Sequence, residues 1–122
     1  MMNGVSVVIP AFNEESSIQL VITELRDLLL EHKIISEIIV VDDGSTDATA
    51  QRANAARARV LQHRSNRGYG ASLKTGIAAA TYDVIAITDA DGTYPGRYLP
   101  QLLAELEGAD MVVGARIGND VH

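Results

Sequence analysis

Residues 37–45, with the sequence EIIVVDDGS, join an apolar run to an acidic turn. The run Glu37–Val41 is rich in β-branched residues, which is typical of a strand buried on both faces of a parallel sheet. An alanine-rich segment follows the turn and extends to about Ala58, and Ser45 or Thr46 is expected to cap it as a helix. This part of the chain therefore predicts a strand, a short acidic loop and a helix.

The same order of strand, loop and helix recurs on both sides of this stretch. Upstream, a strand is predicted over Val5–Ile9, closed by Pro10, and an amphipathic helix over roughly Glu15–His32, capped by Asn13 or Ser16. Downstream, the expected elements are a strand at Val60–Gln62, a helix at Ala71–Ala80, a strand at Asp83–Thr88, a helix marked by Leu99, Leu102, Leu103 and Leu106, and a strand at Met111–Val113. This alternation predicts a single α/β domain over residues 1–122, with three layers (α/β/α) around a mainly parallel sheet.

Composition excludes several classes of protein. The 122 residues suit one domain, and the absence of Cys excludes disulfides and Cys-based zinc sites. With 10 Lys and Arg against 16 Asp and Glu, the net charge of −6 argues against a nucleic-acid partner. No apolar run reaches the roughly 18 residues of a membrane span, and the N-terminus lacks a signal-peptide layout. We expect a cytoplasmic protein, held at the cytoplasmic face of a membrane only through segments outside this sequence.

Five carboxylates follow the predicted strands directly. These residues are Glu14, Asp42, Asp43, Asp89 and Asp91. In an open parallel sheet the carboxyl ends of the strands share one edge, where ligands bind. Crowded carboxylates repel one another, and a divalent cation with oxygen ligands, Mg²⁺ or Mn²⁺, would relieve that cost. In Asp89-Ala90-Asp91, a DXD motif, extended backbone would turn both aspartates toward one ion.

The loop Asn66–Gly70 leads into a helix that carries Lys74. Glycines before a helix can expose backbone N–H groups to an anion, and Arg64, Arg67 and Lys74 would add positive charge. A flexible turn with solvated basic side chains explains the same residues and is slightly preferred on spacing alone. The three histidines, His32, His63 and His122, have no partner at metal or triad spacing and are expected at the surface.

Three segments resemble the inverting family 2 glycosyltransferases, which have the Rossmann-like GT-A fold: Val5–Glu14, Val40–Asp47 and Asp89–Asp91. Two further segments, Asn66–Ala71 and Gly114–Arg116, look most like the branch of this family that transfers hexoses to dolichyl or polyprenyl phosphate. The similarity covers nearly the whole chain, with four motifs in the family's order. The resemblance implies transfer of a hexose from a UDP- or GDP-linked sugar to such a phosphate, with inversion and with Mg²⁺ or Mn²⁺.

The resemblance also implies roles for individual residues. Pro10, Ala11, Phe12 and Glu14 would line the nucleotide pocket, and Asp43, with Asp42 behind it, would accept a hydrogen bond from a base ring N–H. Asp89 and Ala90 would lie along the ribose and sugar, and Asp91, with Asp89, would bind the metal that bridges the diphosphate. Lys74 and Arg116 would be secondary contacts to the anion.

The chain departs from the family pattern in two respects. Thr93 stands where the dolichyl-phosphate mannosyltransferase pattern often has Gln, which changes the expected metal coordination. Only 31 residues follow Asp91 (122 − 91), so the acceptor half, and the carboxylate that would act as base, are expected beyond His122. We therefore expect the donor half of a longer fold, weak transfer by these residues alone, and self-association through an uncovered sheet edge.

Three other interpretations of the sequence compete with this one. A fragment of this kind could bind nucleotide sugar and metal without turnover. Val84–Thr93 also resembles the haloacid-dehalogenase-type phosphatases, in which Asp89 would be the nucleophile and Asp91 the general acid and base. That motif normally opens its domain, whereas here it follows the fourth predicted strand and no Lys follows Lys74. A receiver-like signalling domain also carries a pair of acidic residues, but that pair follows its first strand. In this chain the pair Asp42 and Asp43 follows the second predicted strand.

Overall fold

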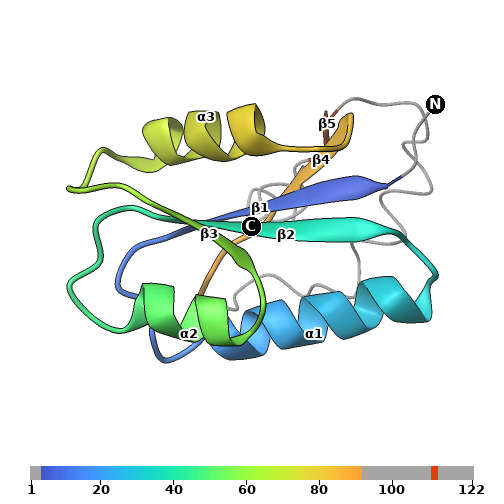
Figure 1. Cartoon of the computed structure of the whole chain (residues 1–122), viewed down its shortest axis with the longest axis horizontal. Helices are drawn as coiled ribbons and strands as arrows, with labels where there is room; N and C mark the ends of the chain where they lie inside the picture. The colour runs from blue at the N-terminus through green and yellow to red at the C-terminus, as the bar shows by residue number, and fades with distance from the viewer. Residues whose placement is uncertain (1–3, 92–110, 113–122) are drawn as a thin grey trace, which may run out of the picture.

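The computed structural model of the chain describes residues 4–91 and 111–112 (Figure 1). Its elements, in chain order, are β1 (Val5–Ala11), α1 (Ile18–Glu31), β2 (Ser36–Asp42), α2 (Thr49–Ala55), β3 (Arg59–Gln62), α3 (Tyr69–Ala79), β4 (Val84–Ile87) and β5 (Met111–Val112). The five strands form one sheet in the order β3-β2-β1-β4-β5, and every pair of neighbours is parallel. The prediction of a parallel α/β sheet is confirmed.

Helices cover both faces of this sheet, with α3 on one side and α1 and α2 on the other (Figure 1). The α1 side of the core contains Ile18, Ile22, Leu25 and Leu29, whose spacing of three and four residues places them on one face of the helix. The α3 side is smaller and is built on Val8, Ile39, Val41 and Ile87. Strands β1, β2, β3 and β4 each contribute side chains to both sides of the core, which explains the continuous apolar runs of the sequence.

Strand β1 continues through Pro10 to Ala11, although the sequence predicted that Pro10 would close it. Val5 N–H donates to Ile35 on the β2 side, whereas the Val8 carbonyl accepts from Thr88 on the β4 side. The backbone N–H and C=O groups of even-numbered β1 residues thus point toward β4, and those of odd-numbered residues point toward β2. The β4 pairing ends at Val8, so the missing N–H of Pro10 falls where no ladder bond is needed.

The predicted helix starts and caps are wrong for α1 and α2. Helix α1 begins at Ile18, and its N-cap residue, Ser17, makes no side-chain capping bond; Asn13 instead has a positive φ of 54° in the preceding loop. Helix α2 is short, with Ala48 at its N-cap and no capping bond from Ser45 or Thr46. The predicted helix around Leu99–Leu106 lies outside the described residues. Within the described part of the chain, no helix has the length and apolar character needed to cross a bilayer.

Helix α3 packs closely on the sheet at Gly76, which is buried. A Cβ added there would collide with the Cγ1 methyl of Val8 and would lie 3.2 Å from Cγ2 of Val41. The glycine therefore sets the separation between α3 and the two central strands. This separation matters because the loop entering α3 forms one wall of the pocket described next.

Candidate functional site

A pocket of about 270 Å³ opens at the carboxyl end of β1, between the β1 and β2 loops and the start of α3. Its lining residues are Pro10, Ala11, Phe12, Asp43, Asn66, Gly68, Tyr69 and Ser72. Four of these, Pro10, Ala11, Phe12 and Asp43, are residues that the sequence assigned to a nucleotide pocket. Two aromatic side chains are exposed around it, since Phe12 is 44% and Tyr69 37% accessible.

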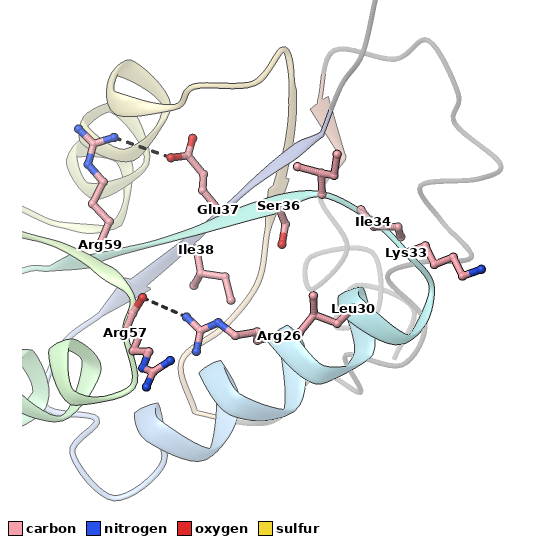
Figure 2. Close-up of a pocket in the computed structure, with 10 residues that line it drawn as sticks. Arg26, Leu30, Lys33, Ile34, Ser36, Glu37, Ile38, Arg57 and Arg59 are labelled. Carbon is pink, nitrogen blue, oxygen red and sulfur yellow. Dashed lines mark hydrogen bonds and ion pairs between the residues drawn. The ribbon is translucent and has the colours of Figure 1, made fainter.

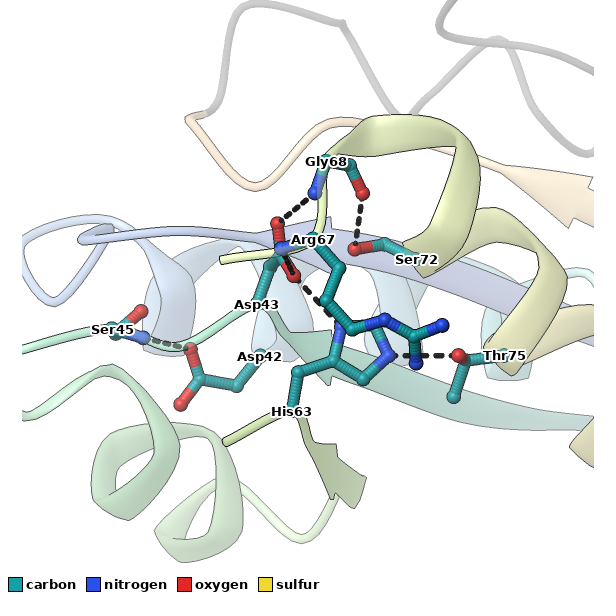
Figure 3. Close-up of polar contacts among 8 residues, drawn as sticks. All are labelled: Asp42, Asp43, Ser45, His63, Arg67, Gly68, Ser72 and Thr75. Atoms are coloured by element: carbon teal, nitrogen blue, oxygen red, sulfur yellow. Dashed lines mark hydrogen bonds and ion pairs between the residues drawn. The ribbon is translucent and has the colours of Figure 1, made fainter. Parts of the chain in front are cut away.

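The Asp43 carboxylate is held by the loop that enters α3 (Figure 3). Its Oδ2 accepts a hydrogen bond from the Gly68 amide at 2.9 Å, and its Oδ1 accepts one from the Arg67 amide at 2.9 Å. The backbone N–H groups that the sequence offered as an anion site thus bind an anion of the chain itself. The side chains of Arg64 and Arg67 are exposed, as the solvated-turn interpretation expected.

His63 is the third donor to Asp43, and the prediction that it lies at the surface is wrong. Its side chain is only 7% exposed, with Nδ1 at 2.7 Å from Asp43 Oδ1 and Nε2 at 2.8 Å from Thr75 Oγ1 (Figure 3). A carboxylate only accepts, so Nδ1 carries the proton. His63 follows β3 directly, so the rule that located the acids at strand ends also applied to it. His32, by contrast, is 47% exposed as predicted, and His122 lies outside the described residues.

The environment of Asp43 favours its charged form. Burial acts to raise the pKa of this carboxyl, but the hydrogen bonds from His63 and from the amides of Arg67 and Gly68 outweigh it and hold the pKa below its ordinary value. Gly44 allows the loop to come this close. It has a φ of +79°, and a Cβ there would lie 2.7 Å from the backbone of Ser65.

Asp42 has a structural role and does not line the pocket. Only 1% exposed, it accepts from the Ser45 amide at 3.1 Å through Oδ1 and from Gln62 Nε2 at 3.4 Å through Oδ2. It therefore folds back the turn after β2 and ties it to β3. The two adjacent aspartates consequently stabilise different loops.

The loops after β1 and β2 are hydrogen-bonded to each other. The Asn13 side chain accepts from the Thr46 amide at 2.9 Å, and Asn13 N–H donates to Ser45 Oγ at 2.8 Å. Next along the chain, the Glu14 amide donates to Thr49 Oγ1 at 2.9 Å. These cross-links fix the backbone around Phe12 and Glu14 without any ligand.

Glu14 lies within the electrostatic reach of three other acids. Burial, and then the charges of Asp91, Asp47 and Asp89, raise the pKa of Glu14 despite a hydrogen bond from Ser17. Ser17 Oγ also donates to the Ala90 carbonyl at 2.7 Å, which ties the start of α1 to the Asp89-Ala90-Asp91 turn. Glu14, Asp89 and Asp91 thus share one edge of the sheet, as the sequence predicted. Ala90 is buried in the α1-side core.

The donor set at this edge suits a hard divalent cation, because it consists of carboxylate oxygens. Across residues 4–91 and 111–112, no three His, Cys, Asp or Glu side chains come together as a group that would hold a metal by themselves. Mg²⁺ commonly uses one or two carboxylates and completes its shell with water and substrate phosphates. The pair Asp89 and Asp91 fits that mode of binding.

Other predicted site residues lie elsewhere. Lys74 is exposed on α3 and does not line the pocket. Arg116 and Thr93 lie outside the described residues. Asn66, Tyr69 and Ser72 were not assigned as site residues from the sequence, although the first two belong to the loop that it singled out. Ser72 lies outside that loop, within α3, and no sequence signal marked it; its hydroxyl donates to the Gly68 carbonyl.

A second pocket, of about 590 Å³, lies at the opposite edge of the sheet, where β2 and β3 begin (Figure 2). Arg26, Lys33, Arg57 and Arg59 make it basic, but two of these cations have structural partners. Arg26 donates to the carbonyls of Ala56 and Arg57 at the end of α2, and Arg59 faces Glu37 at 3.9 Å. None of the residues predicted as a binding site lies there.

The fold and the pocket define the class: a parallel α/β domain with its candidate site at the carboxyl edge of the sheet. More specifically, the chain belongs to the family described as Glycosyl transferase family 2, whose pattern matches residues 6–122. The matched residues include the Asp89-Ala90-Asp91 turn, on which the phosphatase interpretation was based. The family match therefore gives that interpretation no support. The GT-A fold predicted from the sequence is confirmed by solved structures of family relatives.

Several relatives are similar over most of the chain. It is 35% identical over 120 residues to an undecaprenyl-phosphate mannosyltransferase of Micrococcus luteus, covering 92% of the chain and 48% of that protein. It is 35% identical over 116 residues to a dolichyl-phosphate hexose transferase of Haloferax volcanii, covering 94% of the chain and 49% of that protein. The chain spans about half the length of the curated relatives it matches.

A solved structure adds ligands to this comparison. Glucosyl-3-phosphoglycerate synthase from Mycobacterium tuberculosis, in complex with Mn²⁺, UDP-glucose and phosphoglyceric acid, superposes with a TM-score of 0.74 at 32% identity. The superposition covers 88% of this chain and 40% of that one.

Proposed function

We propose that this chain is the donor-binding part of a glycosyltransferase that uses a UDP- or GDP-linked hexose. The observation that carries the proposal is the pocket at the carboxyl ends of β1 and β2, where Pro10, Ala11, Phe12 and Asp43 meet beside the carboxylates of Glu14, Asp89 and Asp91. A ligand that places a base in the pocket and a diphosphate near these acids matches both halves of the site.

Phe12 and Asp43 would bind the base. The exposed Phe12 ring offers a face for stacking, and the ionised Asp43 offers an acceptor to a ring N–H such as those of uracil and guanine. Because Asp43 is fixed by three hydrogen bonds from the chain, the acceptor is oriented before the nucleotide arrives. Such preorganisation reduces the entropy lost on binding.

Asp89 and Asp91 would hold Mg²⁺ or Mn²⁺ against the diphosphate. When bound, the cation would neutralise the nucleoside diphosphate as the glycosidic bond breaks. The chain's own part is to orient the aspartates through the Ser17 contact to Ala90 and to set Glu14 beside them. The Mn²⁺ and UDP-glucose in the mycobacterial synthase structure support divalent-metal use.

For the acceptor we propose a polyprenyl phosphate, with inversion at the sugar carbon. The names of the Micrococcus luteus and Haloferax volcanii relatives support this acceptor, whereas inversion rests on the resemblance to the inverting family 2 glycosyltransferases. The mycobacterial synthase, with phosphoglyceric acid in its complex, shows that a similar fold also occurs with a small phosphorylated acid. In both cases the group that receives the sugar belongs to a phosphorylated compound.

Titration calorimetry with UDP and GDP, each with Mn²⁺ or with EDTA, tests the metal-dependent donor site. We expect binding with Mn²⁺ and a loss of at least about tenfold in affinity with EDTA or in Asp91→Asn. Asp83→Asn, at an exposed aspartate just before β4, is the matched control and should bind as the unaltered chain does. Equal affinity with EDTA and Mn²⁺ would contradict the metal-bridged site. Comparison of UDP-glucose with GDP-mannose in the same format would then show which of these two nucleotide sugars binds more tightly.

A further inference from the structure

The Asp43 carboxylate has little hydrogen-bonding capacity left for a ligand. Its two oxygens offer about four lone-pair positions in total. Oδ1 already accepts from His63 Nδ1 at 2.7 Å and from the Arg67 amide at 2.9 Å, and Oδ2 accepts from the Gly68 amide at 2.9 Å. Counting the donors in the described part of the chain, one acceptor position remains, and it is on Oδ2.

The candidate bases differ in how many donors they present. Uracil offers one ring N–H, at N3. Guanine offers the N1–H and the exocyclic N2 amino group side by side, a pair that matches the two oxygens of a free carboxylate. A carboxylate whose Oδ1 already accepts two hydrogen bonds can accept the single N3–H of uracil through Oδ2. It cannot also accept the second donor of guanine, which is left without a carboxylate acceptor. An unpaired donor in a desolvated site costs binding free energy.

We infer that His63 is a specificity-determining positioning residue: by filling Oδ1 of Asp43, it makes the base site selective for uracil over guanine. This inference rests on the proposed function and narrows its donor from UDP or GDP to UDP. His63 is suited to the role because its ring is 7% exposed and is held from the far side by Thr75 Oγ1 at 2.8 Å. The ring therefore cannot turn away from Asp43 without losing both bonds.

Calorimetric titration of the full chain with UDP, GDP and IDP in the presence of Mg²⁺ tests this. We expect UDP to bind about tenfold or more tightly than GDP. IDP, which lacks the N2 amino group, should bind at least as tightly as GDP. This comparison needs no variant. GDP binding as tightly as UDP, or more tightly than IDP, would overturn the inference.

Two substitutions of His63, by side chains of similar size, test whether this residue positions Asp43 or has a structural role alone. His63→Leu removes the donor to Oδ1, so the preference for UDP over GDP should fall toward parity. His63→Asn keeps an N–H near the Nδ1 position and should retain the preference, and His32→Leu, at an exposed histidine, is the remote control. An unchanged ratio in folded His63→Leu would refute the role of His63. If neither UDP nor GDP binds, the proposed function itself fails, whereas equal binding of both refutes only the selectivity.

Discussion

The Asp43 carboxylate accepts a hydrogen bond from the Gly68 amide at 2.9 Å, across 25 residues of sequence. This contact joins the residue that follows β2 to the N-cap residue of α3, and both residues line the candidate pocket. The wall of the pocket is thus part of the hydrogen bonding that stabilises the fold. Substitutions at Asp43 should consequently affect stability as well as binding.

Asp43→Asn should lower the free energy of unfolding by about 2–3 kcal/mol, because it replaces a buried charged acceptor of three hydrogen bonds with an amide that has one acceptor oxygen. Urea denaturation followed by circular dichroism measures this loss. Asp83→Asn makes the same chemical change at an exposed position and should be within about 0.5 kcal/mol of the unaltered chain. Equal stability of the two variants would show that Asp43 does not hold the loop.

The stabilisation by Asp43 should depend on pH in a defined direction. Since the pKa of Asp43 is lower in the folded chain than its ordinary value, its contribution is fully present above about pH 4–5 and is lost as pH falls through the folded pKa. The difference in unfolding free energy between the unaltered chain and Asp43→Asn should therefore shrink between about pH 5 and pH 3. A difference that stays constant over this range would contradict the account.

Gly76→Ala should destabilise the chain by about 1–3 kcal/mol, because the added methyl meets Val8 and Val41 beneath α3. Gly70→Ala is a control on the same helix, since a Cβ there meets nothing within 4 Å. That variant should be neutral or slightly stabilising, because Ala favours helix more than Gly does. Thermal unfolding compares the two, and a Gly76 variant as stable as the Gly70 variant would contradict the close packing.

Phe12→Ala should weaken UDP binding about tenfold while leaving the unfolding free energy nearly unchanged. The ring is 44% exposed at the rim of the pocket, so it contributes little to the core and is available for stacking. Leu20→Ala, at a side chain 62% exposed on α1, is the matched control and should bind UDP normally. Comparable losses in both variants would argue against a stacking role.

The sequence predicted the sheet and the edge that carries the site because both depend on local patterns. The apolar runs of β1, β2 and β4 and the acids that follow them are visible without tertiary structure. The caps were not predictable in this way. The Ala48 amide at the start of α2 donates to Glu15 Oε1 at 3.2 Å, and Glu15 belongs to the loop after β1, 33 residues away.

His63 illustrates the same limit at the site. Its spacing to Asp43 and Thr75 along the chain, 20 and 12 residues, carries no recognisable motif, so only the pairing of β2 with β3 brings the three together. The position at the end of a strand likewise did not separate Asp42 from Asp43, and only the family resemblance placed Asp42 behind Asp43. Their separate roles follow from the different loops that fold back on each of them.

The most direct test of the central claim is a map of backbone amide NMR shifts during titration of the chain with UDP and Mg²⁺. If the carboxyl edge binds the nucleotide, the largest changes will be at Phe12, Gly68, Tyr69 and Ser72. Changes centred on Lys33, Ser36 and Arg57, at the pocket on the opposite edge, would contradict the account, as would no change at saturating UDP.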